Sequence, residues 1–423
     1  MSAAILDDLA ARGLVHDSTD LDVLRRRLDE GPMTLYAGFD PTADSLHVGH
    51  LVPLLVLRRF QEHGHRPIAL AGGATGMIGD PSGRSEERNL LDDATLAANV
   101  AAITDQLRRF LDFARDPNPA TLVDNRTWTA DLGALAFLRD VGKHVTVNQM
   151  LAKESVRSRV ESTQGISFTE FSYMLLQAND FKWLYDHQRC ELQVGGSDQW
   201  GNITAGIDLI RKTSGGAAHG LTVPLMTRSD GSKFGKTAAG AVWLDPARTS
   251  PYEFFQYWMQ VDDRDVERFL LQLTLLPVDE CRVVAAEHAA APERRVGQRR
   301  LAEAMTSLVH GAAAADEAAR ASAGFTRAVR ELSADELARL ADELPTTSVA
   351  VAELIDADVV DVLVRCGVAS SKSDARRAIA GGGISVNDER IAEPRPLGAG
   401  DLLHGRFVML RKGKKLRHMV VTG

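Results

Sequence analysis

LYAGFDPTADSLHVGH, at residues 35–50, is the stretch that decides the fold of this chain. Residues 34–39 combine aliphatic, aromatic and small side chains, which suits a buried strand, and an Asp-Pro pair then breaks the pattern. A helix should follow, with a side-chain cap at Asp44 or Ser45. Pro53 lies beyond the expected first turn, so we expect either a kink there or a later helix start.

Two histidines fall at the start of this predicted helix. His47 and His50 are three residues apart and therefore share one helix face, and Gly49 leaves the backbone open to a flat ring. The first turn of a helix presents unpaired N–H groups and the positive end of the dipole, which stabilise phosphate. The pattern indicates a nucleotide triphosphate site, although the same four letters also occur by chance at helix starts.

A second predicted strand, at residues 67–71, leads into the glycine-rich loop at residues 72–81. The order strand, helix, strand, loop indicates an α/β fold with a parallel sheet. The loop matches neither the dinucleotide fingerprint nor the P-loop, and its alternative role is a tight turn that lets backbones pack closely. Asp80 in this loop is a candidate partner for an ammonium group.

A polar face is predicted on the helix that begins with a capping box at residues 167–170. Tyr173, Gln177 and Asp180 are spaced four and three apart, so they lie on one face of that helix among apolar neighbours. A buried polar group without a partner costs about 1–3 kcal/mol, so a polar ligand would explain the face. The alternative is an ordinary solvated side of the helix.

Two further segments carry polar groups near predicted glycine turns. Asp198 and Gln199 follow a predicted strand that ends in two glycines. Lys233 and Lys236 lie in a glycine- and serine-rich loop at residues 228–240. Such a cationic loop suits a transient phosphate, although two lysines in a loop are more often just solvated charges.

Composition limits the class of protein. A chain of 423 residues allows about two to four domains. The formal net charge is −8, yet residues 402–423 contain basic residues and no acidic ones. Cys190, Cys281 and Cys366 are too far apart for a disulfide framework or a zinc site, which fits a reducing cytoplasm. No protein-bound metal site is expected, because no two of these cysteines have metal-ligand spacing. No apolar run is long enough to span a membrane, so no membrane association is expected.

Basic side chains cluster near the C-terminus. Lys372, Arg376 and Arg377 fall on one predicted helix, with Ser371 or Ser373 as its cap. A positive helix beside a basic strand is typical of contact with an RNA backbone, whereas the alternative is an ordinary solvated face.

Together these segments resemble the bacterial tyrosyl-tRNA synthetases, a family of class I aminoacyl-tRNA synthetases, over nearly the whole chain. Residues 47–50 (HVGH) match the HIGH motif, residues 233–237 (KFGKT) match the KMSKS loop in a variant spelling, and residues 353–420 match the S4 RNA-binding module. The replaced letters of the KMSKS loop leave both of its lysines in place.

The resemblance implies a fold of three parts. These are an α/β, Rossmann-like parallel-sheet catalytic domain at residues 1–240, with an insertion at about 120–190, an α-helical domain at 241–344 and a small α+β S4-like RNA-binding domain at 345–423.

The resemblance also implies the reaction. L-Tyrosine would be activated by ATP to tyrosyl-adenylate and pyrophosphate, and the tyrosyl group would pass to the 3′-terminal adenosine of tRNA-Tyr. ATP is then a substrate with Mg²⁺ on its phosphates, and a cytoplasmic homodimer that binds tRNA-Tyr but neither DNA nor a membrane is expected.

The resemblance assigns site residues by matching motif positions. The expected catalytic residues are His47, His50, Lys233 and Lys236. The expected tyrosine-binding residues are Tyr36 and Asp180 at the phenolic hydroxyl and Asp80, Tyr173 and Gln177 at the ammonium group. The expected ATP- or adenylate-binding residues are Gly38, Asp40, Thr42, Asp198, Gln199 and Lys236. The expected RNA-binding residues are Lys372, Arg376 and Arg377.

Three alternatives remain open at this point. A nucleotidyltransferase could share the histidine helix, but Tyr36 with Asp180 disfavours it. A tryptophanyl-tRNA synthetase is the nearest sibling, but it would not usually carry the S4 module. An RNA-binding protein with an inactive synthetase body is disfavoured because His47, His50 and both lysines are intact.

Overall fold

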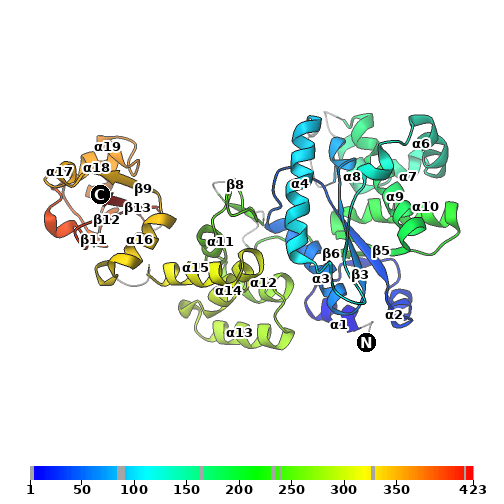
Figure 1. The fold of residues 1–423 in the computed structure, drawn as a ribbon, viewed down its shortest axis with the longest axis horizontal. Coiled ribbons are helices and arrows are strands. Elements are labelled where there is room, and N and C mark those ends of the chain that lie inside the picture. Colours follow the sequence, from blue (N-terminus) through cyan, green and yellow to red (C-terminus); the bar gives the residue numbers. More distant parts are fainter. Residues whose placement is uncertain are drawn as a thin grey trace. The chain divides into compact units, whose positions relative to one another are not determined.

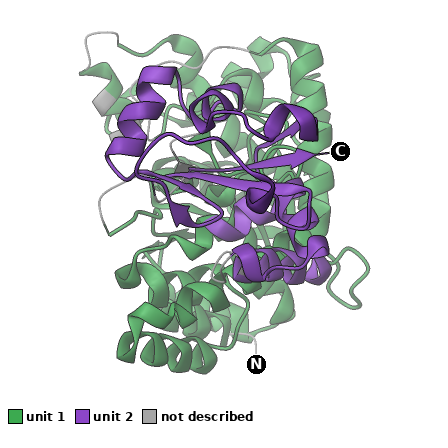
Figure 2. Ribbon diagram, turned by 90° about the vertical axis from the view of Figure 1, so that its left-hand side faces the viewer, with its two compact units in different colours: residues 1–249, 257–310 green, residues 250–256, 311–423 purple. Residues whose placement is uncertain are grey.

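The computed structural model describes residues 4–82, 91–161, 165–229, 234–237, 240–324, 329–413 and 416–422. The chain divides into two compact units, which Figure 2 shows in different colours. The first unit contains residues 1–249 and 257–310, and the second contains residues 250–256 and 311–423.

A six-stranded sheet forms the centre of the first unit, with strand order β1-β6-β5-β2-β3-β4. Its strands are β1 (Asp17–Ser18), β2 (Thr34–Phe39), β3 (Arg66–Ala71), β4 (Thr121–Asp124), β5 (Cys190–Gly196) and β6 (His219–Val223). All neighbours run parallel except β1, which is antiparallel to β6. The predicted α/β fold with a parallel sheet is thereby confirmed. The apolar sequence of residues 221–226 also predicts a strand, but β6 ends at Val223.

Helices cover both faces of this sheet (Figure 1). The helices nearest to it are α1 (Ala4–Ala11), α2 (Leu21–Asp29), α3 (Leu51–Glu62), α4 (Asp93–Phe110), α9 (Phe168–Gln188) and α10 (Trp200–Ser214). Helices α3 and α4 lie on one side of the sheet, and α9 and α10 lie on the other. The chain order of the strands reverses between β2 and β5, and in parallel sheets ligands bind at the carboxyl ends of the strands at such a point.

The start of α3 explains how Pro53 is tolerated. The α-helix begins at Leu51, so Pro53 lies in its first turn, where backbone N–H groups have no partner within the helix. Of the two expectations for Pro53, the later helix start is therefore confirmed.

Short helices fill the chain between β4 and α9. They are α5 (Arg126–Thr129), α6 (Ala134–Asp140), α7 (Val147–Leu151) and α8 (Glu154–Val160). This segment packs on α9 and α10 through a small apolar cluster that includes Val141, Met150 and Met174. A buried ion pair of 2.7 Å joins Arg159 of α8 to Glu170 of α9. This ion pair holds α8 against α9, the helix that carries Tyr173.

Helices make up most of the first unit beyond residue 257. Its longer helices include α12 (Val266–Leu273), α13 (Val278–Ala290) and α14 (Val296–His310), while α11 (Pro251–Met259) is divided between the two units. Arg59, near the end of α3, is buried and donates a hydrogen bond to the carbonyl oxygen of Thr274, just after α12. Burial lowers the pKa of Arg59 to about 10. The helix that follows the histidine motif is therefore anchored to α12 at its far end.

The second unit combines helices with a five-stranded sheet of order β11-β10-β12-β13-β9. Its helices are α15 (Ala312–Gly324), α16 (Ala334–Glu343), α17 (Val351–Leu354), α18 (Val359–Arg365) and α19 (Lys372–Ala380), and its strands are β9 (Thr346–Val349), β10 (Ile384–Val386), β11 (Glu389–Arg390), β12 (Phe407–Lys412) and β13 (Leu416–Thr422). Helices α18 and α19 pack in one apolar cluster with the sheet, and α16 packs in another. The alanine- and arginine-containing sequence of residues 334–343 predicts a helix, and α16 confirms it.

One sequence prediction fails in this unit. Residues 344–348 have the composition of a linker, but β9 begins at Thr346 and pairs in parallel with β13. Val349 at the end of β9 is only 5% exposed and belongs to the core of the unit. The strand went unrecognised because its threonines and serine are also typical of loops, and only long-range pairing with β13 distinguishes the two.

Candidate active site

The histidine motif forms a 3₁₀ turn, Val48–His50, immediately before α3. The predicted cap at Asp44 or Ser45 is wrong, because His47 caps this turn. Asp44 instead forms an ion pair with Arg248, and the Ser45 hydroxyl donates a hydrogen bond to a neighbouring carbonyl oxygen.

Backbone hydrogen bonds fix both imidazole rings. The Nδ1 atom of His47 accepts from the N–H of Gly49 at 3.0 Å, and the Nδ1 atom of His50 accepts from the N–H of His47 at 3.1 Å. A ring nitrogen that accepts carries no proton, so each neutral ring has its proton on Nε2. The ring centroids are 4.0 Å apart, and a Cβ atom on Gly49 would lie 2.8 Å from Cε1 of His47. Glycine is therefore required for His47 to fold back over this turn.

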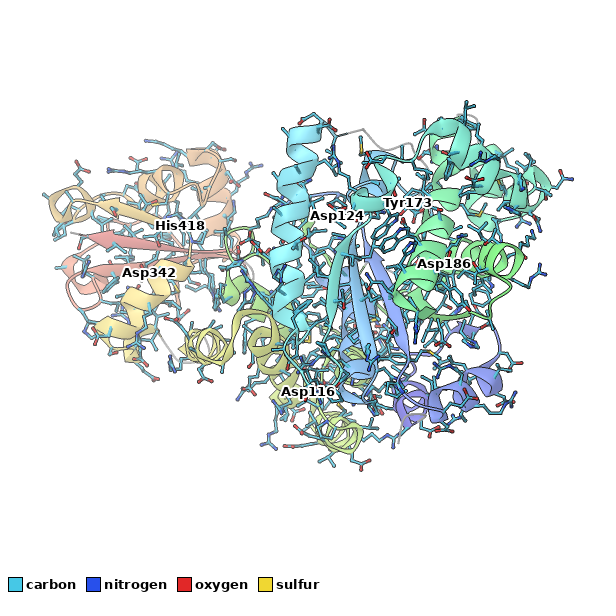
Figure 3. The ribbon with its side chains drawn as sticks, turned by 45° about the vertical axis from the view of Figure 1, so that its right-hand side comes forward. Asp116, Asp124, Tyr173, Asp186, Asp342 and His418 are labelled. Carbon is cyan, nitrogen blue, oxygen red and sulfur yellow. The ribbon has the colours of Figure 1, made fainter. Side chains whose placement is uncertain are left out.

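A pocket of about 310 Å³ lies at the carboxyl ends of β2 and β5, beside the histidine turn. Twelve of the predicted site residues line it, namely Tyr36, Gly38, Asp40, Thr42, His47, His50, Asp80, Tyr173, Gln177, Asp180, Asp198 and Gln199. Figure 3 labels Tyr173 on α9 and Asp124 at the end of β4, toward the same end of the sheet. The structure thus brings together residues that the sequence spreads from 36 to 199.

The deep end of the pocket combines Tyr36 and Asp180. Asp180 is 3% exposed and accepts hydrogen bonds from Nδ2 of Asn125 at 2.9 Å and Nε1 of Trp128 at 2.8 Å. Burial raises the pKa of Asp180 to about 7 in spite of these two donors. The hydroxyl of Tyr36 is buried and has no hydrogen-bond partner among the described residues. This end of the pocket therefore has an unused hydroxyl close to a carboxylate.

Carboxylates dominate the other side of the pocket. Asp80 accepts from the N–H of Ser82 at 2.9 Å and from Nε2 of Gln199 at 2.7 Å. The hydroxyl of Tyr173 donates to Asp40 at 2.8 Å. Burial, reinforced by the charge of Asp80, raises the pKa of Asp198. Such a concentration of negative charge favours a positively charged ligand group here.

The backbone of the lysine segment lies against the histidine turn. The short strand β7 (Lys236–Thr237) pairs with β8 (Gly240–Ala241), and Gly235 before it has a φ of 75°. A Cβ atom on Gly235 would lie 2.8 Å from Cγ2 of Val48. Lys233 lies outside the described residues, and only the backbone of Lys236 is described. The structure therefore places the start of β7, but neither lysine side chain, beside the histidines.

Four residues close to the site escaped the sequence analysis. Asn125 and Trp128 bind Asp180, and Asn202 binds Gln177 and Gln199. Gln193 lines the pocket, and its Oε1 atom has no hydrogen-bond partner among the residues that the structure describes. Gln193 alone gave a usable signal, because it is a polar residue two positions before the glycine pair that precedes Asp198 and Gln199.

The predicted RNA-binding residues lie on α19, in the second unit. Lys372, Arg376 and Arg377 are all exposed, and the expected cap at Ser371 is confirmed by its hydrogen bond from the N–H of Asp374. Lys372 also forms an ion pair of 2.6 Å with Asp361. The helix thus presents its basic side chains to solvent.

Within the described ranges, no group of three or more His, Cys, Asp or Glu side chains is arranged to hold a metal ion. No helix in those ranges is both long and apolar enough to cross a membrane. Cys190, Cys281 and Cys366 are buried free thiols.

Known proteins match the chain along most of its length. The family described as tRNA synthetases class I (W and Y) matches residues 28–326, and the tyrosine–tRNA ligase SYY-like C-terminal domain matches residues 336–420. The tyrosine–tRNA ligase of Opitutus terrae is 56% identical over 415 residues, which cover 97% of this chain and 98% of that protein. The tyrosine–tRNA ligase of Geobacillus stearothermophilus is 52% identical over 419 residues, covering 98% and 99%.

Solved structures agree with these relatives. A C-terminally truncated mitochondrial tyrosyl-tRNA synthetase of Aspergillus nidulans has a TM-score of 0.70 at 33% identity, covering 76% of this chain and 94% of that one. The tryptophanyl-tRNA synthetase of Plasmodium falciparum has a TM-score of 0.54 at 14% identity, which shows a shared fold only.

The parallel sheet, the pocket at its strand reversal and the histidine turn define a class I aminoacyl-tRNA synthetase. The chain belongs to the class I tRNA synthetases for tryptophan and tyrosine. Within that group it is placed with the tyrosine–tRNA ligases, which activate tyrosine with ATP and charge tRNA. The nucleotidyltransferase and inactive RNA-binding alternatives are thereby set aside.

Proposed function

We propose that the pocket holds tyrosine with its phenol at Tyr36 and Asp180 and its ammonium group near Asp80, Tyr173 and Gln177. The observation that carries this assignment concerns Tyr36, which lines the pocket and is 1% exposed: its hydroxyl has no hydrogen-bond partner in the described part of the chain. A buried polar group of this kind costs about 1–3 kcal/mol unless a ligand pairs with it. The phenolic oxygen of tyrosine can accept from Tyr36 and donate to Asp180, so both groups gain a partner.

ATP would occupy the side of the pocket nearest the histidine turn. His47 and His50 line that side, and their Nε2–H groups are suited to donate to phosphate oxygens, with Thr42 nearby. Gly38, Asp40, Asp198 and Gln199 would then contact the nucleotide or the adenylate.

The chemistry of activation needs no nucleophile from the protein. The carboxylate oxygen of tyrosine attacks the α-phosphorus of ATP, the new bond forms the mixed anhydride, and the bond to the bridging oxygen of pyrophosphate breaks. The protein's work is to hold two anions in line and to stabilise the charge on the departing group. We assign the second task to Lys233 and Lys236, because Gly235 between them lies against Val48.

The second half-reaction transfers tyrosine to RNA. A ribose hydroxyl of the terminal adenosine of tRNA-Tyr attacks the carbonyl carbon of the adenylate, AMP departs and an ester forms. Mg²⁺ would arrive on the phosphates of ATP, because its preferred ligands are oxygens and it usually binds through substrate phosphates in such sites.

The pocket assignment is tested by exchange of labelled pyrophosphate into ATP. The wild-type protein should exchange label only when tyrosine is present. A Tyr36→Phe variant, which removes one oxygen atom from the pocket wall, should raise the KM for tyrosine and leave the KM for ATP unchanged. Exchange that does not depend on tyrosine, or a Tyr36→Phe variant with an unchanged KM for tyrosine, would contradict the assignment.

We further propose that residues 345–423 bind tRNA, following a helical domain at 241–344 and the catalytic domain at 1–240. Lys372, Arg376 and Arg377 support this because their exposed charges lie on one helix. The three buried, unpaired thiols are compatible with the reducing cytoplasm that we assign to the protein.

A homodimer is the oligomeric state we propose. Large apolar side chains are exposed between β4 and the first turn of α9: Leu135 is 84% exposed, and Phe168, the first residue of α9, is 77% exposed. Leu138, Val147 and Val160 of the same segment are also about half exposed. An apolar surface of this kind marks an interface, and a second copy of the chain would cover it.

A further inference from the structure

Asn202 connects two side chains that line the pocket, Gln177 and Gln199. It lies in the first turn of α10, is 4% exposed and does not itself line the pocket. Its Nδ2 atom donates to Oε1 of Gln177 at 3.0 Å and to Oε1 of Gln199 at 3.2 Å. An amide –NH₂ has two hydrogen atoms, so both are used by these two glutamines.

These two hydrogen bonds determine which way each glutamine amide faces. With its oxygen bound to Asn202, Gln199 turns its Nε2 atom to Asp80 and donates to it at 2.7 Å. The opposite orientation of Gln199 would place an amide oxygen against a carboxylate oxygen, and two acceptors cannot pair. Gln177 is fixed in the same way, with its oxygen toward Asn202.

The network ends on Asp80, a carboxylate that lines the pocket. Asp80 has one oxygen bound by the N–H of Ser82 at 2.9 Å and the other bound by Gln199. Its position therefore depends on Gln199, and the orientation of Gln199 depends on Asn202. Gln177 is the second residue held by Asn202, and it also lines the pocket.

We propose that Asn202 is a positioning residue for the ammonium group of the substrate: it holds Gln177 directly, and Asp80 through Gln199, in the orientation that binds this group. The inference rests on the proposed contacts of Asp80 and Gln177 with the ammonium group. Asn202 would not touch the substrate itself, but it would determine the orientation of the two side chains that do, Asp80 and Gln177.

The test is the Asn202→Asp variant, which has nearly the same shape but can only accept hydrogen bonds. Both glutamines would have to turn over, so Gln199 would present its oxygen to Asp80. A carboxylate is well tolerated in the first turn of a helix, so α10 should fold. Asn202→Ala removes both donors without adding charge, and it separates the loss of the hydrogen bonds from the effect of a new charge.

Tyrosine and two of its analogues distinguish a defect in binding the ammonium group from a general loss of binding. Tyramine has the phenol and the ammonium group but no carboxylate, and 3-(4-hydroxyphenyl)propanoate has the phenol and the carboxylate but no ammonium group. In both variants the KM for tyrosine and the Ki for tyramine should rise about tenfold, because the buried hydrogen bonds that orient the two glutamines are mismatched in one variant and lost in the other. The Ki for the propanoate and the KM for ATP should stay unchanged.

Thr204→Val is the matched control on the same helix. The Thr204 hydroxyl binds Lys153 and backbone carbonyls, and it does not line the pocket, so this variant should keep wild-type constants. Equal losses for tyramine and the propanoate, or no loss for tyramine in either Asn202 variant, would overturn the inference. A wild-type protein without tyrosine-dependent exchange would instead overturn the proposed function itself.

Discussion

Replacing Asp180 by asparagine should change how the stability of the protein depends on pH. Burial raises the pKa of Asp180 from 3.8 to about 7 in the folded protein. Between these two values the folded protein keeps a proton that the unfolded chain has lost, so wild-type stability falls as pH rises through this window. The shift of about 3 units corresponds to roughly 4 kcal/mol, fully expressed above about pH 7.

Asparagine does not titrate, so the Asp180→Asn variant lacks this loss. It gives up one of the two hydrogen bonds from Asn125 and Trp128, but that cost is the same at every pH. The unfolding free energy of the variant minus that of the wild type should therefore rise by up to about 4 kcal/mol between pH 4 and pH 8.

Urea unfolding at a series of pH values, followed by tryptophan fluorescence, measures this difference. Asp186→Asn is the matched control, because Asp186 lies on the exposed side of the same helix and pairs with Lys182 (Figure 3). Its difference from wild type should show a much weaker dependence on pH. Parallel pH profiles for wild type and Asp180→Asn would refute the reasoning, because they would mean that burial does not hold a proton on Asp180.

Three further predictions concern other parts of the chain. Gly235→Ala should slow pyrophosphate exchange about tenfold without changing the KM for tyrosine, because alanine at a φ of 75° costs about 1–2 kcal/mol and its Cβ meets Val48. An unchanged rate would show that catalysis does not depend on the position of the segment that carries Lys233 and Lys236. Phe168→Asp should give a monomer where the wild type sediments as a dimer, and α9 should still fold because an acidic residue suits its first turn; identical masses would remove the proposed interface. Arg376→Glu combined with Arg377→Glu should weaken tRNA binding and its salt dependence while exchange stays at the wild-type rate, and unaltered charging kinetics would show that α19 does not contact RNA.

The pocket was predictable from the sequence where its residues follow glycine turns or helix spacing. Tyr173, Gln177 and Asp180 share a face because of helical periodicity, and the histidine turn follows a recognisable strand. Asn202 and Trp128 were not predictable, because nothing local distinguishes them from ordinary helix residues. Their partners Gln177 and Asp180 lie 25 and 52 positions away. Their contribution exists only once α9 packs against its neighbours.

The prediction of the helix cap was wrong because an imidazole nitrogen can accept the same backbone hydrogen bond as a side-chain oxygen. A side-chain oxygen of Asp44 or Ser45 was expected to cap the helix start, but a ring nitrogen of His47 accepts the backbone hydrogen bond instead. That solution requires a glycine two residues later, so that the ring can fold back, and Gly49 provides it. The general rule for helix starts favours Asp and Ser, and it does not consider imidazole as an acceptor.

The parallel pairing of β9 with β13 limits how the enzyme can be shortened from its C-terminal end. A chain that stopped at residue 349 would keep β9 without its partner strand β13, and α16 would lose Phe407 and Met409, against which Leu337 and Leu340 pack. Such a fragment would be prone to self-association for reasons unrelated to catalysis. Stopping before α16 removes both liabilities at once, so a soluble minimal enzyme should end upstream of Ser333.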